Sequence, residues 1–148
     1  MPNTIILLGQ GCRKEGIASS AITPGHLVEF GGANDLQVHS TAAGNARKAF
    51  AVENDLIGNG IDDAYAAGDQ VQYNVFRPGD EVYALVADGA PAISKNDALE
   101  SAGDGTLRKI TPGASATSAR IDGIIGYALE AVDNSGGSSA ARIRIEVA

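Results

Sequence analysis

Residues 67–87, AGDQVQYNVFRPGDEVYALVA, contain two apolar runs that each follow a Gly-Asp pair. In the first run Val71, Tyr73 and Val75 alternate with other residues, which is the period of a strand with one buried face. In the second run, over residues 81–87, apolar side chains occupy both faces, which is typical of a central strand or of one covered by a partner. Proline and glycine between the runs favour a tight turn. The segment therefore predicts two strands joined by a turn.

The turn that precedes these strands recurs elsewhere in the chain. Four segments share a turn residue and a polar residue ahead of an apolar strand, namely Pro24-Gly25-His26, Ala67-Gly68-Asp69, Pro78-Gly79-Asp80 and Lys95-Asn96-Asp97. Gly and Asn tolerate a positive φ, and an Asp side chain is expected to bond to its own backbone two residues further on. Their spacing is uneven, which excludes a solenoid. The pattern is typical of a compact β-barrel or sandwich.

Further strands are predicted on both sides of this segment. Their ranges are 4–8, 26–30, 36–39, 47–53, 98–100, 106–110, 124–132 and 142–147, with a hairpin loop at 101–105. Acidic residues at the start of residues 62–67 favour one or two helical turns there. Residues 111–119, rich in Ser, Thr, Ala and Gly, are expected to form an exposed loop. The predicted fold class is therefore all-β, with at most one or two short helices.

The periodicity divides the chain into two parts. Residues 1–21 are predicted to form an N-terminal arm, because the short apolar run of Ile5, Ile6, Leu7 and Leu8 is followed by a polar, glycine-containing stretch with little periodicity. Residues 22–148 are predicted to form a single β-domain. The arm is expected to be a mobile extension or to lie across a partner.

The composition excludes several classes of protein. A chain of 148 residues with 44% hydrophobic residues can bury a core, and its net charge of −7 argues against a nucleic-acid partner. The single cysteine, Cys12, cannot form an internal disulfide and favours a cytosolic origin. No apolar stretch approaches the length of a membrane span, so no membrane partner is expected.

Candidate chemical sites are weak. Cys12 with His26 or His39 offers a nucleophile and a base, so an enzyme that uses this pair is one alternative function. Residues 59–63 offer ligand types for a weak cation site, but turn chemistry explains these acids as well. Residues 103–106 resemble part of a phosphate loop without its lysine. We expect no catalytic, cofactor-binding or metal-binding residue, and no cofactor.

The aromatic residues allow two interpretations. Tyr65, Tyr73, Phe76, Tyr83 and Tyr127 either line a platform for a sugar or pack in a core or interface, and their positions among β-branched residues favour packing. A small carbohydrate- or ligand-binding β-module is therefore the alternative to the structural function described next.

Several segments, in their order along the chain, resemble the capsid cement (decoration) proteins of tailed bacteriophages. They are ARKAFAVEN (46–54), YAAGDQV (65–71), RPGDEV (77–82), GDGTLR (103–108) and IGYALE (125–130), and the resemblance covers about residues 22–148. It implies a small β-barrel-like or β-tulip-like protein that binds the outer surface of an expanded icosahedral capsid and bridges neighbouring subunits.

The same resemblance implies partners and a location. It implies a homotrimer that binds the major capsid protein of the same phage, located on the virion surface after synthesis in the host cytoplasm. The family offers no catalytic residue to transfer. A trimer would also cover the two-faced strand at residues 81–87. We further expect the arm residues Ile5, Ile6, Leu7 and Leu8 to contact the capsid by adding a strand to a capsid-protein sheet.

Overall fold

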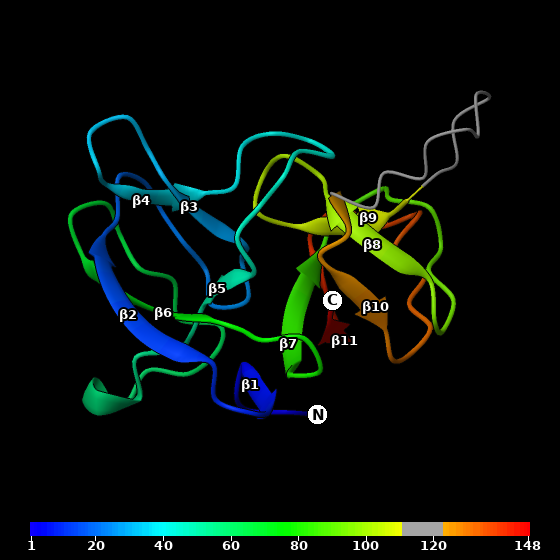
Figure 1. Ribbon diagram of the computed structural model, residues 1–148, viewed down its shortest axis with the longest axis horizontal. Coiled ribbons are helices and arrows are strands. Elements are labelled where there is room, and N and C mark those ends of the chain that lie inside the picture. The colour runs from blue at the N-terminus through cyan, green and yellow to red at the C-terminus, as the bar shows by residue number, and fades with distance from the viewer. Residues whose placement is uncertain (111–122) are drawn as a thin grey trace.

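The computed structural model describes residues 1–110 and 123–148, and these residues form an all-β fold (Figure 1). The strands are β1 (Ile6–Leu8), β2 (Cys12–Ile17), β3 (Val28–Phe30), β4 (Leu36–Val38), β5 (Ala49–Ala51), β6 (Gln70–Val75), β7 (Glu81–Val86), β8 (Ala98–Ser101), β9 (Leu107–Lys109), β10 (Gly126–Ala128) and β11 (Ala141–Val147). The helical structure includes a short 3₁₀ turn, η1 (Asp55–Ile57). None of the described helical structure is long and apolar enough to cross a membrane.

Five strands, of which β7 is one, close into a barrel. The order is β7-β11-β10-β8-β9, and β9 returns to β7 through a parallel pairing of Leu107 with Val86. β1 pairs with the same edge of β7 as β9 does, nearer the start of the strand, where Ile6 lies opposite Val82. The predicted central strand is confirmed, since β7 has neighbours on both edges and nearly all of its residues are buried. Its second face is covered by its own chain, so this strand no longer argues for a trimer.

The barrel interior is filled by side chains that alternate along the strands. On β11 the residues Ile143, Ile145 and Val147 are buried, while Arg144 and Glu146 between them are exposed. The strand predicted at residues 142–147 is confirmed, and the alternation follows from the period of two residues in a strand.

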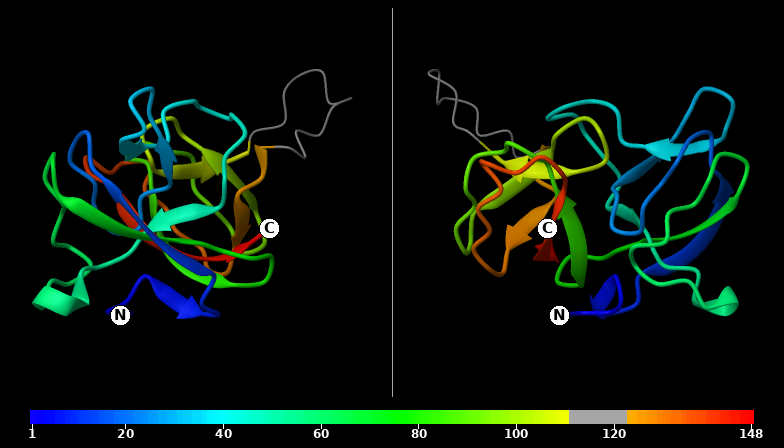
Figure 2. Two further views of the ribbon diagram at one scale, coloured as in Figure 1. Left: turned by 60° about the vertical axis from the view of Figure 1, so that its left-hand side comes forward. Right: turned by 180° about the vertical axis from the view of Figure 1, so that it is seen from behind.

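The other strands form an open lobe beside the barrel, made of the sheet β2-β6-β5 and the hairpin β3-β4 (Figure 2). The lobe has a smaller apolar core of its own, to which Ile22, Val28, Leu36 and Tyr73 contribute. Unlike the barrel, its sheets do not close, and β2 lies at an edge.

The four predicted turns are all present, with one difference in their bonding. In each, the side chain of the fourth residue accepts a hydrogen bond from the backbone N–H three residues earlier, not two residues further on. The pairs are Thr23 N–H to His26 Nδ1 (3.1 Å), Ala66 to Asp69 (2.8 Å), Arg77 to Asp80 (3.0 Å) and Ser94 to Asp97 (2.7 Å). The third residue has a positive φ in every case, including Asn96 at 74°.

The helical turn predicted at residues 62–67 is wrong. Asp63 instead accepts a hydrogen bond from Gly60 N–H at 2.7 Å, and Tyr65 pairs with Ile22 in an isolated bridge. Acidic side chains favour the N-terminus of a helix, but they stabilise a turn equally well. In this segment they stabilise a turn. The exposed loop predicted at residues 111–119 lies outside the described residues.

The first 21 residues contain two strands that pair within the chain. β1 pairs with β7, and β2 pairs with β6 along its whole length, from Cys12 opposite Val75 to Ile17 opposite Gln70. β2 was missed in the sequence because nearly all of its side chains are exposed, so it shows no apolar alternation.

Candidate binding site

The four residues of the predicted arm contact differ in exposure. Ile5 is buried in the barrel core, and its N–H donates to Glu53 Oε2 at 3.1 Å. Ile6 and Leu7 are partly buried against the same core. Leu8 is 59% exposed at the end of β1. Leu8 is therefore the most accessible of the four side chains to another molecule.

A groove lies between the hairpin β3-β4 and the strands β5 and β6, with a volume of about 290 Å³. Phe30, 46% exposed, forms part of its wall. The Arg47 guanidinium lies 5.8 Å from the centre of the Phe30 ring, and Tyr73 meets that ring edge-on at 6.3 Å. This arrangement combines an exposed aromatic face with a cation, which suits a partly apolar ligand with polar or anionic groups.

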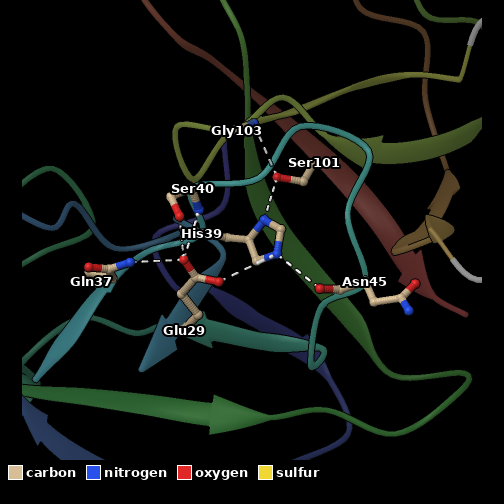
Figure 3. A network of polar contacts seen from close by, with 7 residues as sticks. All are labelled: Glu29, Gln37, His39, Ser40, Asn45, Ser101 and Gly103. Atoms are coloured by element: carbon tan, nitrogen blue, oxygen red, sulfur yellow. Dashed lines mark hydrogen bonds and ion pairs between the residues drawn. The ribbon is translucent and has the colours of Figure 1, made fainter. Parts of the chain in front are cut away.

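Below the groove His39 is the centre of a buried polar network (Figure 3). Its side chain comes from the loop after β4, and its Nδ1 lies 2.7 Å from Ser101 Oγ on β8. Its Nε2 lies 3.1 Å from the carbonyl oxygen of Asn45. Because a carbonyl only accepts, Nε2 carries a hydrogen and donates it to Asn45, while Nδ1 shares the other hydrogen bond with the Ser101 hydroxyl. The ring therefore joins the open lobe to the barrel.

Glu29 on β3 extends the same network. Its Oε1 accepts from Ser40 N–H at 3.0 Å, from Ser40 Oγ at 2.7 Å and from Gln37 Nε2 at 2.9 Å, and its Oε2 lies 3.6 Å from His39 Nε2. Burial acts to raise the pKa of Glu29, but the hydrogen bonds from Ser40 and Gln37 outweigh it and lower the pKa below its usual value. The carboxylate thus stays ionised at neutral pH and fastens the hairpin.

Ser101, His39 and Glu29 are the residue types of a hydrolase triad. In this protein the serine and the histidine are not accessible to a substrate. Ser101 is 0% exposed and His39 1% exposed. Ser101 Oγ also accepts from Gly103 N–H at 3.1 Å, so it is engaged on both sides. A substrate carbonyl has no route to this hydroxyl. The network is a structural joint.

The other candidate residues do not assemble into chemical sites. Cys12 is exposed on β2, and its thiol makes no polar contact with either histidine. The ring of His39 contacts Ser101 and Asn45, and the ring of His26 accepts a hydrogen bond from Thr23 N–H. Within the described residues no cluster of three or more His, Cys, Asp or Glu side chains is positioned to hold a metal ion.

The acids of residues 59–63 and the glycine-rich loop have partners within the protein. Asp62 Oδ1 pairs with Arg142 at 3.2 Å, and Asp63 bonds to Gly60 N–H. In the β8–β9 loop Asp104 accepts from Thr106 N–H at 3.0 Å, as expected of a turn rather than a phosphate loop.

The aromatic residues mostly pack in the two cores. Four of the five are buried, as the packing interpretation expects: Tyr65, Tyr73, Phe76 and Tyr83. The fifth, Tyr127, is exposed. Phe30, which lies on the groove, was not singled out from the sequence. It ends a three-residue strand before Gly31, and the other residues that line the groove are distant in sequence, so no local pattern marks it.

Together the closed barrel, the open lobe and the groove define a small all-β protein. The chain matches no protein-family model, and no curated protein is similar to it in sequence. Its structure is similar to that of the head fiber gp8.5 N base of bacteriophage phi29, with a TM-score of 0.55, 15% sequence identity and coverage of 92% of each chain. At this identity the comparison shows a common fold.

Proposed function

We propose that the protein is a structural component of a bacteriophage head, and specifically a capsid cement protein. The observation that carries the proposal is the common fold, over 92% of both chains, with the base of a phage head fibre. The order of the turn motifs along the sequence, which resembles that of cement proteins, supports it independently. The barrel and the open lobe supply stable surfaces, and the function requires no chemical step.

The proposed mechanism is the burial of interfaces at several points at once. A homotrimer on the outer surface of the capsid would contact the major capsid protein of the same phage through each copy. Several linked contacts bind far more tightly than one, because the second and third form within a single complex. Such bridges oppose the separation of neighbouring capsid subunits.

The arm residues Ile5, Ile6, Leu7 and Leu8 remain a proposed capsid contact, as does the division into residues 1–21 and 22–148. β1 is the last strand of its sheet, so a capsid strand could add to its outer edge. Deletion of the arm removes Ile5 from the barrel core and tests folding as well as binding. The substitution Leu8→Pro is the sharper test, because it obstructs strand addition at an exposed position.

The test of the main proposal is to mix the purified protein with expanded and unexpanded capsids that lack it, and to image both. We expect density at regular positions on the outside of expanded capsids, and capsids that resist heating better. Native mass spectrometry of the free protein tests the trimer. Binding to neither form of capsid contradicts the proposal.

The groove supports a second candidate function, a ligand-binding β-module. The observation that favours it is the exposed Phe30 ring with Arg47 above it. A glycan array tests it with Phe30→Ser, which should abolish binding, and with Tyr127→Ser, which alters an exposed aromatic residue that does not line the groove. An array with no bound glycan argues against a carbohydrate ligand.

A further inference from the structure

The groove beside Phe30 carries a positive charge that the described part of the protein does not neutralise. Arg47 lines the groove, and its guanidinium lies 5.8 Å from the centre of the Phe30 ring. Among the described residues no carboxylate forms an ion pair with Arg47, whereas Arg108, Arg142 and Arg144 each have one. The charge of Arg47 is therefore available to a ligand in the groove.

Tyr73 supplies a hydrogen-bond donor beside Arg47. Its side chain lines the same groove, and the residue is 2% exposed. Burial raises the pKa of the Tyr73 phenol, and the Arg47 guanidinium acts against this change, which places the guanidinium close to the hydroxyl. A protonated hydroxyl and a guanidinium that lie together are suited to binding a carboxylate.

Lys14 adds a second cation next to this pair. It lies on β2 directly opposite Tyr73 of β6, so the two side chains project from the same face of the sheet. The acid that lines the groove is Glu29, so the two cations outnumber it. In a chain with a net charge of −7, this local excess of positive charge favours an anionic ligand.

Glu29 and Phe30 narrow the class of ligand further. The hydrogen bonds that Glu29 accepts within the protein all go to Oε1, and its side chain is 28% exposed, so Oε2 is left to accept from a ligand hydroxyl. The half-exposed Phe30 ring offers a face for C–H groups. The groove volume of about 290 Å³ is at the small end of ligand sites, which indicates one ring-sized unit. A ring with a C–H face, hydroxyl groups and a carboxylate is an acidic sugar.

We propose that the groove binds a uronic-acid unit of a glycan, with its carboxylate at Arg47 and Tyr73, its hydroxyl groups at Glu29 and its C–H face on Phe30. The inference rests on the ligand-binding function given above as the second candidate, and it names the class of ligand. β1, the proposed capsid contact, does not line the groove, so the two sites are separate.

The test titrates the isotope-labelled protein with methyl β-glucuronide and with methyl β-glucoside, followed by NMR. The two probes differ only in having a carboxylate or a hydroxymethyl group on the ring. The wild type should bind the glucuronide at least about tenfold more tightly, because hydrogen bonds between charged groups are stronger than those between neutral groups. The amide signals that shift should include those of Phe30 and Arg47.

Two substitutions locate the carboxylate. Arg47→Gln should reduce the preference for the glucuronide to less than about twofold and leave the affinity for the glucoside unchanged. Arg13→Gln is the matched control, because Arg13 is an arginine of the same lobe that lies opposite Asn74, on the other face of the sheet from Tyr73. It should keep the full preference. Both arginines are exposed, so both variants should unfold at the wild-type temperature.

The remaining outcomes separate the competing explanations. Equal binding of the two glycosides overturns the carboxylate contact and leaves the ligand-binding function standing. N-acetylglutamate that binds as tightly as the glucuronide overturns the sugar and assigns the groove to an acidic peptide. If neither glycoside shifts the signals of the groove, the inference falls, and the glycan array decides separately whether the ligand-binding function falls with it. Capsid binding by Arg47→Gln should equal that of the wild type, and its loss would make the groove a capsid contact and overturn the inference.

Discussion

The barrel and the open lobe are built from strands of similar length, but they differ in how the edges are used. In the barrel the pairing of β9 with β7 closes the sheet, so the backbone groups of its strands bond to one another. In the lobe two small sheets remain open, and the groove, the polar network around His39 and the exposed turn at Leu56 all lie there or at its border. The closed part stabilises the fold, and the open part presents surfaces.

Three contacts keep the two regions from behaving as separate domains. Phe50 of β5 belongs to the barrel core, although its strand is part of the lobe. His39 of the lobe bonds to Ser101 of β8. Arg142 of β11 donates to the carbonyl oxygen of Pro24, in the turn that leads into β3. Breaking these contacts one at a time measures how strongly the lobe depends on the barrel.

The largest effect is expected from Phe50→Ala. The ring is fully buried and meets Phe76 at 6.0 Å, so its removal opens a cavity between the two regions. We expect the free energy of unfolding, measured in urea, to fall by about 3–5 kcal/mol. Phe30→Ala, at the half-exposed ring of the groove, is the control and should cost much less. If the two substitutions cost the same, Phe50 does not join the regions.

Arg142→Ala should have the next largest effect. The guanidinium donates to Pro24 O at 3.0 Å and to Ile61 O at 2.6 Å, and it lies 5.6 Å from the centre of the Tyr83 ring. Its removal leaves two carbonyl groups without this donor, and we expect a loss of about 2–3 kcal/mol by urea unfolding.

Arg144→Ala is the matched control for Arg142→Ala. Arg144 lies on the same strand but is exposed, and its pair with Glu81 is long at 3.9 Å, so its removal should cost less than about 0.5 kcal/mol. Similar losses for the two variants would show that the contacts of Arg142 with Pro24 and Ile61 contribute nothing to stability.

The sequence predicts local features of both regions and misses those that depend on distant residues. The alternation of β11 and the four turns are readable because each depends on neighbours within a few positions. The contact of His39 with Ser101 spans 62 positions, and neither residue carries a local signal for it. β2 was missed because an edge strand with polar side chains on both faces has no apolar period.

The four turns allow a matched comparison between the regions, in which the expected loss in the free energy of unfolding is about 1 kcal/mol. Asp69 ends a turn that leads into β6 of the lobe, and Asp97 ends one that leads into β8 of the barrel. Asp69→Ala should lower the free energy of unfolding by roughly 0.5–1 kcal/mol, because one exposed hydrogen bond is lost. Asp97→Ala should cost more, because Asp97 also pairs with Lys109 Nζ at 2.9 Å. The reverse order, in urea unfolding of both variants, would contradict the assigned contacts.

The smallest change at neutral pH is expected at His26, which stands where the other three turns have an acid. Burial lowers the pKa of His26; the Asp104 carboxylate acts against this, and the Arg142 guanidinium adds to it. The unfolded chain therefore binds a proton near pH 6.5 that the folded chain binds only at lower pH. The contribution of His26 to stability is present above that pH and is lost as the pH falls through the folded-state pKa.

His26→Asn removes this titration and keeps an oxygen that can accept from Thr23 N–H. Between about pH 7.5 and 5.5 the variant should lose less free energy of unfolding than the wild type does, as measured by urea unfolding at each pH. Asp69→Asn is the control, because it places the same residue type at the equivalent turn position and removes no histidine. It should lose as much free energy of unfolding over this pH range as the wild type does. A wild-type pH dependence that survives in His26→Asn would show that the turn at His26 is not its source.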